Sequence, residues 1–402
     1  MDGRAAFASP EFRAWQIGRV ASVVAQQMQY VALGYSIYDI TGRTLDLGLL
    51  GLVQFVPVAG LSLVSGSVAD RFDRRKIALL CQSAQVVCSL LLLASAIALP
   101  RAVWPIYVVA FLLGVARSFF GPAGQALVPS LVPPEHFANA VAWSSSLWQL
   151  ATIAGPALGG LLMGLAGGTV GVYGVAAALS LISAASIARI GPRPPKTPRG
   201  AASLETVLAG LRFVFSNKVV LGSITVDLFA VLLGGATALL PPVARDILHV
   251  GPLGLGFLRS APAAGAAIVA IAVAYRPIRS GAGVKMLAAV ALFGLGTVVF
   301  GLSTSYPLSL AALAVLGGAD MVSVVVRSVV VQRATPDDMR GRVSAVNTVF
   351  IVASNELGEM ESGLTAAWLG TVPAIVAGGI GTVLVVMACA AAFPALRKAE
   401  ME

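Results

Sequence analysis

Two long apolar stretches, residues 47–69 and 77–99, flank a run of seven residues, 70–76, of which six are charged. Each stretch is long enough to cross a hydrocarbon layer roughly 30 Å thick as a helix. The charged run must then lie in water on one side of a membrane, and its short length makes the two spans antiparallel neighbours. Four of its charges are cations, which predicts that this side is the cytoplasm.

The composition extends this interpretation to the whole chain. Of 402 residues, 57% are hydrophobic and 11% are charged, whereas a soluble domain has about 25% charged residues. The short alternating segments typical of a β-barrel do not occur. We therefore predict an all-α membrane protein with twelve transmembrane helices. The predicted spans are 15–38, 47–69, 77–99, 103–128, 138–165, 170–190, 219–243, 253–275, 286–304, 306–331, 343–369 and 373–395.

The cations are distributed by side. With these spans, 20 of the 27 lysines and arginines fall on the side of the charged run and four on the opposite side. This asymmetry predicts that both termini are cytoplasmic, and we expect a multi-pass protein of the bacterial plasma (inner) membrane. A nucleic-acid-binding protein would gather its cations on a soluble domain, so the net charge of +9 does not indicate a nucleic-acid partner.

The chain divides into two similar halves. A linker over 191–200 holds four prolines and three cations, which predicts an extended, solvated segment. Residues 111–117 align with 314–320, and residues 134–141 align with 336–343, at an offset close to half the chain. We predict an N-terminal six-helix bundle over 1–190, a cytoplasmic linker over 191–218 and a C-terminal six-helix bundle over 219–402. Apolar residues at helical spacing after the linker predict a short helix, either interfacial or a plain connection.

The charged run resembles a family motif. The loop between the second and third helices of the major facilitator superfamily has the pattern G-x-x-x-D-R-x-G-R-R/K. The matching residues are Gly66, Asp70, Arg71, Arg74 and Arg75, with Asp73 in place of the usual glycine. The resemblance implies two pseudo-symmetric six-helix halves, with the substrate near mid-membrane. It also implies that Asp70 lies near the start of the eleventh helix and latches the cytoplasmic side, so Asp70→Asn is expected to slow cycling without abolishing substrate binding. The alternative is a cationic anchor that only sets topology.

Further motifs resemble one branch of this superfamily, the enterobactin exporters or transmembrane secretion effectors, with macrolide efflux pumps as neighbours. The similar stretches are 12–15, 38–42, 227–241, 258–262, 327–347 and 354–363. Residues 151–160, which include Gly155 and Pro156, are similar to the G-x-x-x-G-P-x-x-G-G motif of exporting antiporters, with Ala151 in place of the first glycine. This favours outward transport, and close helix packing without directional meaning is the alternative. Kinship at the level of the fold does not transfer a substrate.

Several charged residues fall inside predicted spans, where each costs at least about 2.5–3.5 kcal/mol on insertion scales. The candidate proton-coupling residues are Glu356, Glu359, Asp227, Asp320, Arg117 and Arg327. The second half holds more carboxylates than arginines, and a partly unmatched carboxylate can exchange a proton near neutrality. Our first candidates are Glu356 and Glu359, followed by Asp227, with Arg327 or Arg117 opposing protonation. The alternative is a fixed network of Asp320, Arg327 and Glu356.

Polar and aromatic residues inside the spans suit a large amphiphilic solute with ring systems. The candidate substrate-binding residues are Gln26, Gln29, Tyr30, Trp143, Trp148, Asn347, Phe350 and Asn355. Taken singly, each also fits ordinary packing or anchoring at the membrane interface.

No phosphate-binding loop, metal-ligand spacing or nucleophile–base arrangement is identifiable, so we predict neither an enzyme nor a cofactor. The function we predict is secondary active export of an amphiphilic small molecule, such as a siderophore-like compound or drug, in exchange for protons. We expect a monomer whose partners are the substrate, protons and the lipid bilayer. The alternatives are an uptake permease or lipid transporter of the same fold, and a transport-inactive receptor or scaffold.

Overall fold

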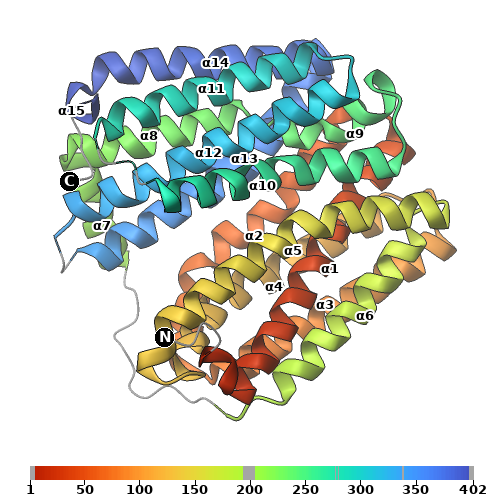
Figure 1. Cartoon of the computed structure of the whole chain (residues 1–402). Coiled ribbons are helices and arrows are strands. Elements are labelled where there is room, and N and C mark those ends of the chain that lie inside the picture. Colours follow the sequence, from red (N-terminus) through yellow and green to blue (C-terminus); the bar gives the residue numbers. More distant parts are fainter. Residues whose placement is uncertain (1–4, 193–203, 277, 279, 337–338, 398–402) are drawn as a thin grey trace. The chain divides into compact units, whose positions relative to one another are not determined.

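The computed structural model describes residues 5–192, 204–276, 278, 280–336 and 339–397, and every regular element in these ranges is a helix (Figure 1). The long helices of the first half are α1 (Pro10–Thr41), α2 (Thr44–Arg71), α3 (Arg74–Ala98), α4 (Trp104–Leu127), α5 (Phe137–Ala166) and α6 (Val170–Ala188). Those of the second half are α8 (Lys218–Leu233), α10 (Pro252–Tyr275), α11 (Ala282–Leu302), α12 (Tyr306–Ala334), α13 (Arg340–Leu369) and α14 (Thr371–Ala392). The short elements are η1 (Ala5–Ala8), η2 (Val128–Ser130), η3 (Pro134–His136), α7 (Leu204–Ser216), η4 (Ala236–Leu239), α9 (Leu240–Pro242), η5 (Val243–Ile247) and α15 (Pro394–Arg397).

The chain forms two compact units. Unit 1 comprises residues 1–40, 53–202 and 252–256, and unit 2 comprises residues 41–52, 203–251 and 257–402. The start of α2 therefore belongs to unit 2, and the first turn of α10 belongs to unit 1. The predicted short helix after the linker is α7, whereas linker residues 193–203, with the predicted helix cap at Ser203, lie outside the described residues. The division at 191–218 stays a prediction.

The same helix packing occurs in both halves. In the first, α3 packs against α4 and α6, and in the second the equivalent α11 packs against α12 and α14. A Cβ on Gly155 of α5 would lie 2.5 Å from Gln27 Cβ on α1. At the equivalent position of α13, a Cβ on Gly358 would lie 2.8 Å from the Val231 carbonyl oxygen on α8. Glycine permits both close approaches, which agrees with a duplicated six-helix arrangement.

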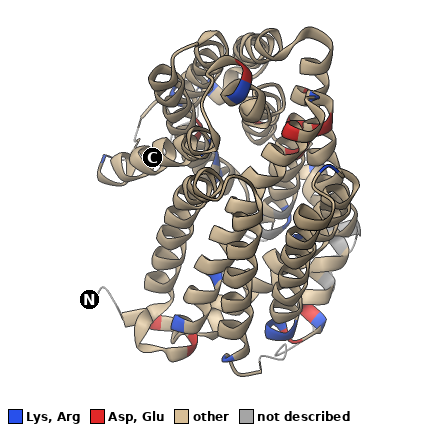
Figure 2. Cartoon of the chain, turned by 90° about the vertical axis from the view of Figure 1, so that its right-hand side faces the viewer, with Lys and Arg blue, Asp and Glu red and all other residues tan. Residues whose placement is uncertain are grey.

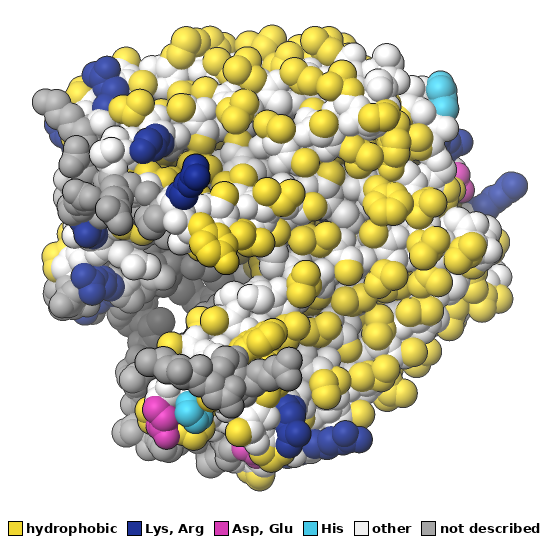
Figure 3. All heavy atoms as spheres, viewed as in Figure 1, with side chains coloured by type: hydrophobic (Ala, Val, Ile, Leu, Met, Phe, Trp, Pro, Cys, Tyr) yellow, Lys and Arg dark blue, Asp and Glu magenta, His cyan; other side chains and the backbone are white. Residues whose placement is uncertain are grey.

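Ten helical segments of the described residues are long and apolar enough to cross a membrane. The two remaining long helices, α1 with 32 residues and α13 with 30, are long enough but more polar. Glutamines lower the hydropathy of α1, and arginines and carboxylates lower that of α13. Figure 2 shows charged residues mostly near helix ends, with long uncharged stretches between them. On the face in Figure 3, hydrophobic side chains are spread widely over the surface, and the charged side chains lie mainly toward its edges, as expected for helices in contact with lipid.

The span predicted over 219–243 is interrupted. Helix α8 ends at Leu233, and the chain continues through Gly234 and Gly235 into η4, α9 and η5. A Cβ on Gly235 would lie 2.5 Å from the Gly358 carbonyl oxygen and 2.8 Å from Ser362 Oγ on α13. The interruption therefore lies tightly against α13, and no side chain larger than that of glycine fits there without movement.

Candidate functional site

A buried ion pair joins α8 and α12 in unit 2. The Arg327 guanidinium donates a hydrogen bond from Nη1 to Asp227 Oδ2, and both side chains are almost completely buried. Asp320 lies seven residues before Arg327 on the same face of α12. The group therefore contains two carboxylates and one guanidinium, and the ion pair of the guanidinium is with Asp227. We call Asp227, Arg327 and Asp320 the carboxylate triad.

A second ion pair lies beside the interruption of α8. Arg259 of α10 donates from Nη2 to Glu359 Oε1 at 3.4 Å and from Nη1 to the Thr237 carbonyl oxygen of η4 at 2.9 Å. Glu359 also lies close to Gly51 in the first half of α2. A Cβ on Gly51 would lie 3.0 Å from Glu359 Cβ. One guanidinium thus links α10, α13 and the broken end of α8.

The other predicted proton-coupling residues, Glu356 and Arg117, belong to neither of these two ion pairs. Glu356 lies one turn before Glu359 on α13 and is 3% exposed. Arg117 of α4 belongs to unit 1, where it lines a cavity and is exposed. Arg327 makes its ion pair with Asp227 on α8, a residue outside the predicted fixed network of Asp320, Arg327 and Glu356, and that network stays a prediction.

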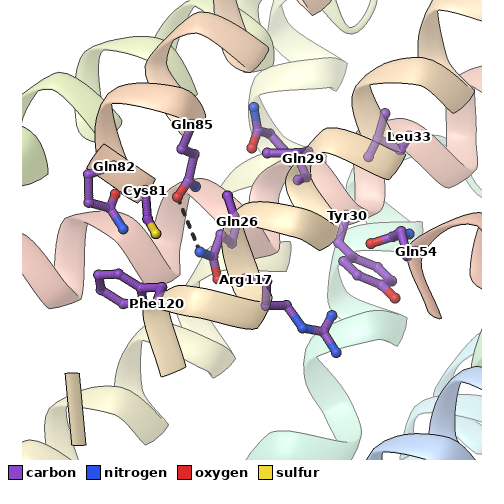
Figure 4. Close-up of a pocket in the computed structure, with 12 residues that line it drawn as sticks. Gln26, Gln29, Tyr30, Leu33, Gln54, Cys81, Gln82, Gln85, Arg117 and Phe120 are labelled. Carbon is purple, nitrogen blue, oxygen red and sulfur yellow. Dashed lines mark hydrogen bonds between the residues drawn. The ribbon is translucent and has the colours of Figure 1, made fainter. Parts of the chain in front are cut away.

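Three of the predicted substrate-binding residues, Gln26, Gln29 and Tyr30, line a partly open cavity of unit 1 of about 50 Å³ (Figure 4). The cavity is bounded by α1, α2, α3 and α4. Sequence reasoning missed three glutamines that complete it, namely Gln54, Gln82 and Gln85. The signal was available, because all three interrupt apolar spans and the last two repeat the three-residue spacing of Gln26 and Gln29.

The remaining candidates lie elsewhere. Trp143 packs edge-on against Phe7 of η1 with ring centroids 5.2 Å apart, and Trp148 is 44% exposed. In unit 2, Phe350 packs against a cluster of buried valines and Asn355 is exposed, with its Nδ2 donating to the Ile351 carbonyl at 2.8 Å. Asn347, also on α13, has a buried Oδ1 without a hydrogen-bond partner among the described residues. Trp143 and Trp148 do not line the cavity that holds Gln26 and Gln29, and the substrate-binding role of all five residues stays a prediction.

Residues of the charged turn between α2 and α3 make hydrogen bonds at the ends of three helices. Asp73 has an extended backbone with φ −61° and accepts a hydrogen bond from the Arg75 amide at 2.9 Å, so it begins α3 as an N-cap without needing a left-handed conformation. Arg74 donates to the Ala126 carbonyl at 3.2 Å, at the end of α4. Arg75 donates to the Ala188 carbonyl at 2.6 Å, at the end of α6. Cations at helix C-termini stabilise the helix dipole. The gating roles predicted for Gly66, Asp70, Arg71, Arg74 and Arg75 stay predictions.

The glycine-rich segment of α5 packs on two sides. Gly155, followed by Pro156, approaches α1 as described above, and a Cβ on Gly159 would lie 3.0 Å from Met28 Cα. A Cβ on Gly160 would lie 2.5 Å from the Pro252 carbonyl oxygen at the first turn of α10. Within unit 1, the segment therefore packs closely against α1 and against the first turn of α10.

Comparison with known proteins identifies the family. The sequence profile of the transmembrane secretion effectors, a family of the major facilitator superfamily, matches residues 2–402. The chain belongs to this family. This secretion effector is therefore a multi-pass membrane transporter of the superfamily, and its family implies a transported small molecule rather than an enzymatic reaction.

Similar proteins agree with this assignment. The chain is 28% identical over 381 residues to the enterobactin exporter EntS of Shigella boydii serotype 18 (strain CDC 3083-94 / BS512), covering 94% of this chain and 90% of that protein. It is 29% identical, with the same coverage, to EntS of Escherichia coli O9:H4 (strain HS). Among solved structures, the nucleoside transporter NupG matches with a TM-score of 0.74 at 14% identity, covering 97% of this chain and all of that one. A POT family transporter matches with a TM-score of 0.74 at 11% identity, covering 96% of each chain. These structures establish the major facilitator fold alone.

Proposed function

We propose that this transporter exports an amphiphilic small molecule across a bacterial plasma membrane in exchange for protons. The observation that carries the proposal is the carboxylate triad, in which the buried Asp227–Arg327 ion pair has a second aspartate, Asp320, on the same face of α12 as Arg327. With both carboxylates ionised, the triad has a net negative charge, and one proton makes it neutral. Charge inside a span is expensive, so the triad is suited to take up and release one proton during a cycle.

The triad is our first candidate for the proton site because its charge is unbalanced. Glu359 is the second candidate, since its ion pair with Arg259 also contacts the broken end of α8 and can change when that segment moves. Glu356, buried one turn away, completes the set. An excess of acid over base in one bundle is expected for a proton-coupled carrier, whereas a scaffold gains nothing from it.

The direction of transport and the class of solute are each supported by observations other than the carboxylate triad. The relatives with 28–29% identity are exporters by name, and residues 151–160 resemble the motif of exporting antiporters. The cavity of unit 1 combines amide side chains with Tyr30 and Phe120, which suits a solute with polar groups and rings. Enterobactin, the solute in the name of these relatives, is therefore the first compound to test, followed by a macrolide and a cationic dye.

The test is solute movement in vesicles that contain the purified protein and an imposed pH gradient. Exchange for protons should accumulate the solute in the acidic compartment, and an ionophore that collapses the gradient should abolish accumulation. Asp320→Asn should lose accumulation but keep downhill movement. Asp246→Asn is the matched control, because Asp246 is a half-exposed carboxylate whose ion pair with Arg245 lies outside the triad. Proton exchange at the triad would be contradicted if movement of these solutes did not depend on the pH gradient. It would also be contradicted if the Asp320→Asn variant still accumulated solute along the gradient.

A further inference from the structure

An open groove runs along α1 in unit 1, away from the amide-lined cavity. It has a volume of about 590 Å³ and lies where α1 meets α5 and α6, the helices on either side of it in Figure 1. On α1, Ile17, Val20 and Val24 recur at three- and four-residue spacing and so form one stripe along the helix. Leu147 of α5 and Leu179 of α6 line the walls. The groove is therefore bounded by three helices of one unit.

The groove is apolar along its length and accessible from outside. Ile17, in the middle of the stripe, is 56% exposed. The amide in the lining, Gln16, is 3% exposed and donates its hydrogen bond to Ser144 of α5. An exposed apolar surface on a membrane-spanning helix is stable against lipid tails and unfavourable against water. A hydrocarbon chain therefore suits the groove, whereas a polar solute finds no accessible partner along it.

The length of the groove matches one leaflet of a bilayer. Arg13 and Val24 mark its two ends on α1 and are eleven positions apart, a rise of about 16 Å. Half of a typical hydrocarbon core is about 15 Å. At the inner end α1 is in close contact with α5, because a Cβ on Gly155 would lie 3.3 Å from the Val24 carbonyl oxygen. A chain that enters beside Arg13 therefore stops near the middle of the membrane.

A cation lies at the outer end of the groove. Arg13 is exposed in the first turn of α1, and its guanidinium makes no hydrogen bond or ion pair with the described residues. The acidic residue of that turn, Glu11, accepts a hydrogen bond from the Gly191 amide at 2.9 Å. A cation in the first turn opposes the helix dipole, so Arg13 does not stabilise α1 by itself. A phosphate group at this point would instead be attracted by both the guanidinium and the start of the helix.

We propose that this groove binds one acyl chain of an anionic phospholipid, with the lipid phosphate paired to Arg13. The distribution of cations along the sequence predicts that this end of α1 is cytoplasmic, so the lipid belongs to the cytoplasmic leaflet. Anionic lipids of that leaflet gain about 1 kcal/mol, or about fivefold in binding, for each cation near the surface. A zwitterionic lipid carries its own ammonium group and gains less.

The position of the lipid is tested by photo-cross-linking to the full chain in lipid nanodiscs. The probes are a phosphatidylglycerol and a phosphatidylethanolamine with the same diazirine-bearing acyl chain, each added at a few per cent, and labelled residues are mapped by mass spectrometry. The phosphatidylglycerol should label the groove residues of α1, α5 and α6 about fivefold more than the phosphatidylethanolamine does. It should also label them more than Leu80 and Leu165, which are 73% and 77% exposed and lie outside the groove.

Two substitutions separate the headgroup from the chain. Arg13→Gln should abolish the preference for phosphatidylglycerol and leave labelling by phosphatidylethanolamine unchanged. Arg189→Gln is its matched control, because Arg189 is an exposed cation at the end of α6 that does not line the groove. Val20→Phe narrows the groove and should reduce labelling of Leu147 by both lipids. Its control is Ile182→Phe, at an exposed position of α6 outside the groove.

Four results would overturn the proposal. Labelling spread evenly over exposed apolar residues would mean that bulk lipid covers the groove. Equal labelling by the two lipids, or equal effects of Arg13→Gln and Arg189→Gln, would mean that Arg13 does not select a headgroup. Loss of groove labelling on addition of enterobactin would assign the groove to the solute. None of these measurements uses a pH gradient, so proton exchange is judged separately by the transport assay.

Discussion

At the residue scale, the arginine of the carboxylate triad has two acidic neighbours with different roles. Arg327 makes a direct ion pair with Asp227, whereas Asp320 acts on the pair through its charge. Removing one partner of a buried ion pair leaves the other charge uncompensated, which is strongly destabilising. Removing an excess like charge leaves a matched pair. The two aspartates are therefore distinguishable by stability as well as by transport.

We predict that Asp227→Asn lowers the free energy of unfolding by about 3 kcal/mol, because it leaves the Arg327 guanidinium buried without its counter-ion. Asp320→Asn should leave the stability unchanged or raise it slightly, because the pair that remains is neutral overall. Thermal unfolding of the purified variants in detergent measures the difference. Equal losses from the two substitutions would mean that both aspartates bind Arg327 equivalently.

A second prediction at this scale concerns the charged turn. Arg75 donates to the carbonyl of the last residue of α6, so Arg75→Ala should cost about 1 kcal/mol of stability. Arg71→Ala is the matched control, since the exposed Arg71 makes no hydrogen bond in the described part of the chain. Unfolding in detergent is again the measurement. If the Arg71 variant loses as much stability, the effect is due to the general charge of the turn and not to the end of α6.

At the element scale, the interruption of α8 is the feature that joins packing to chemistry. Its backbone lies against α13 at Gly358, and its Thr237 carbonyl accepts a hydrogen bond from Arg259, which also pairs with Glu359. A rearrangement of this segment therefore changes the hydrogen bonding of a carboxylate-bound arginine. The broken helix therefore connects backbone packing to an ion pair in unit 2.

Gly235→Ala should accordingly lower stability by about 1–3 kcal/mol, because its methyl group would meet the Gly358 carbonyl oxygen at 2.5 Å. Gly174→Ala on α6 is a suitable control, since no atom lies within 4 Å of its added Cβ. The comparison is made by thermal unfolding of both variants. A Gly235 variant as stable as the Gly174 variant would mean that the segment has room to move without cost.

The elements show how far sequence reasoning reached. The spans were predictable because a membrane requires about 20 apolar residues for each helix, and this requirement leaves a strong signal. The interruption after Leu233 could not be predicted from the sequence. Gly234 and Gly235 are neutral in hydropathy, and only the contact of this segment with α13 shows that the helix ends there. Gln54, Gln82 and Gln85 were missed for a related reason, since their convergence depends on three helices meeting. The contact of Asp227 with Arg327 likewise joins residues 100 positions apart.

At the scale of the whole molecule, the duplicated halves have diverged in chemistry. Unit 1 holds an amide-lined cavity without carboxylates, and unit 2 holds the carboxylate triad and the Arg259–Glu359 pair. The repeat-related positions Arg117 and Asp320 illustrate the divergence, because one lines the cavity and the other belongs to the triad. Exchange of a solute for protons then requires that binding in one unit changes protonation in the other.

This requirement gives a prediction about linkage. Glutamine amides do not ionise, so the glutamines of the cavity give solute binding no pH dependence of their own. If protonation of the triad opposes solute binding, reciprocity requires the solute affinity to fall as the pH falls, by about 5- to 150-fold for a typical coupling free energy.

We therefore expect the exported solute to bind more weakly at about pH 6 than at about pH 8. The Asp320→Asn variant should lose this pH dependence while retaining affinity. Calorimetric titration of the wild type and the variant at both pH values measures it. Affinity that falls equally in the variant would assign the proton to another group, with Glu359 first, because Glu359 and Arg259 form an ion pair of unit 2 in which both side chains are mostly buried.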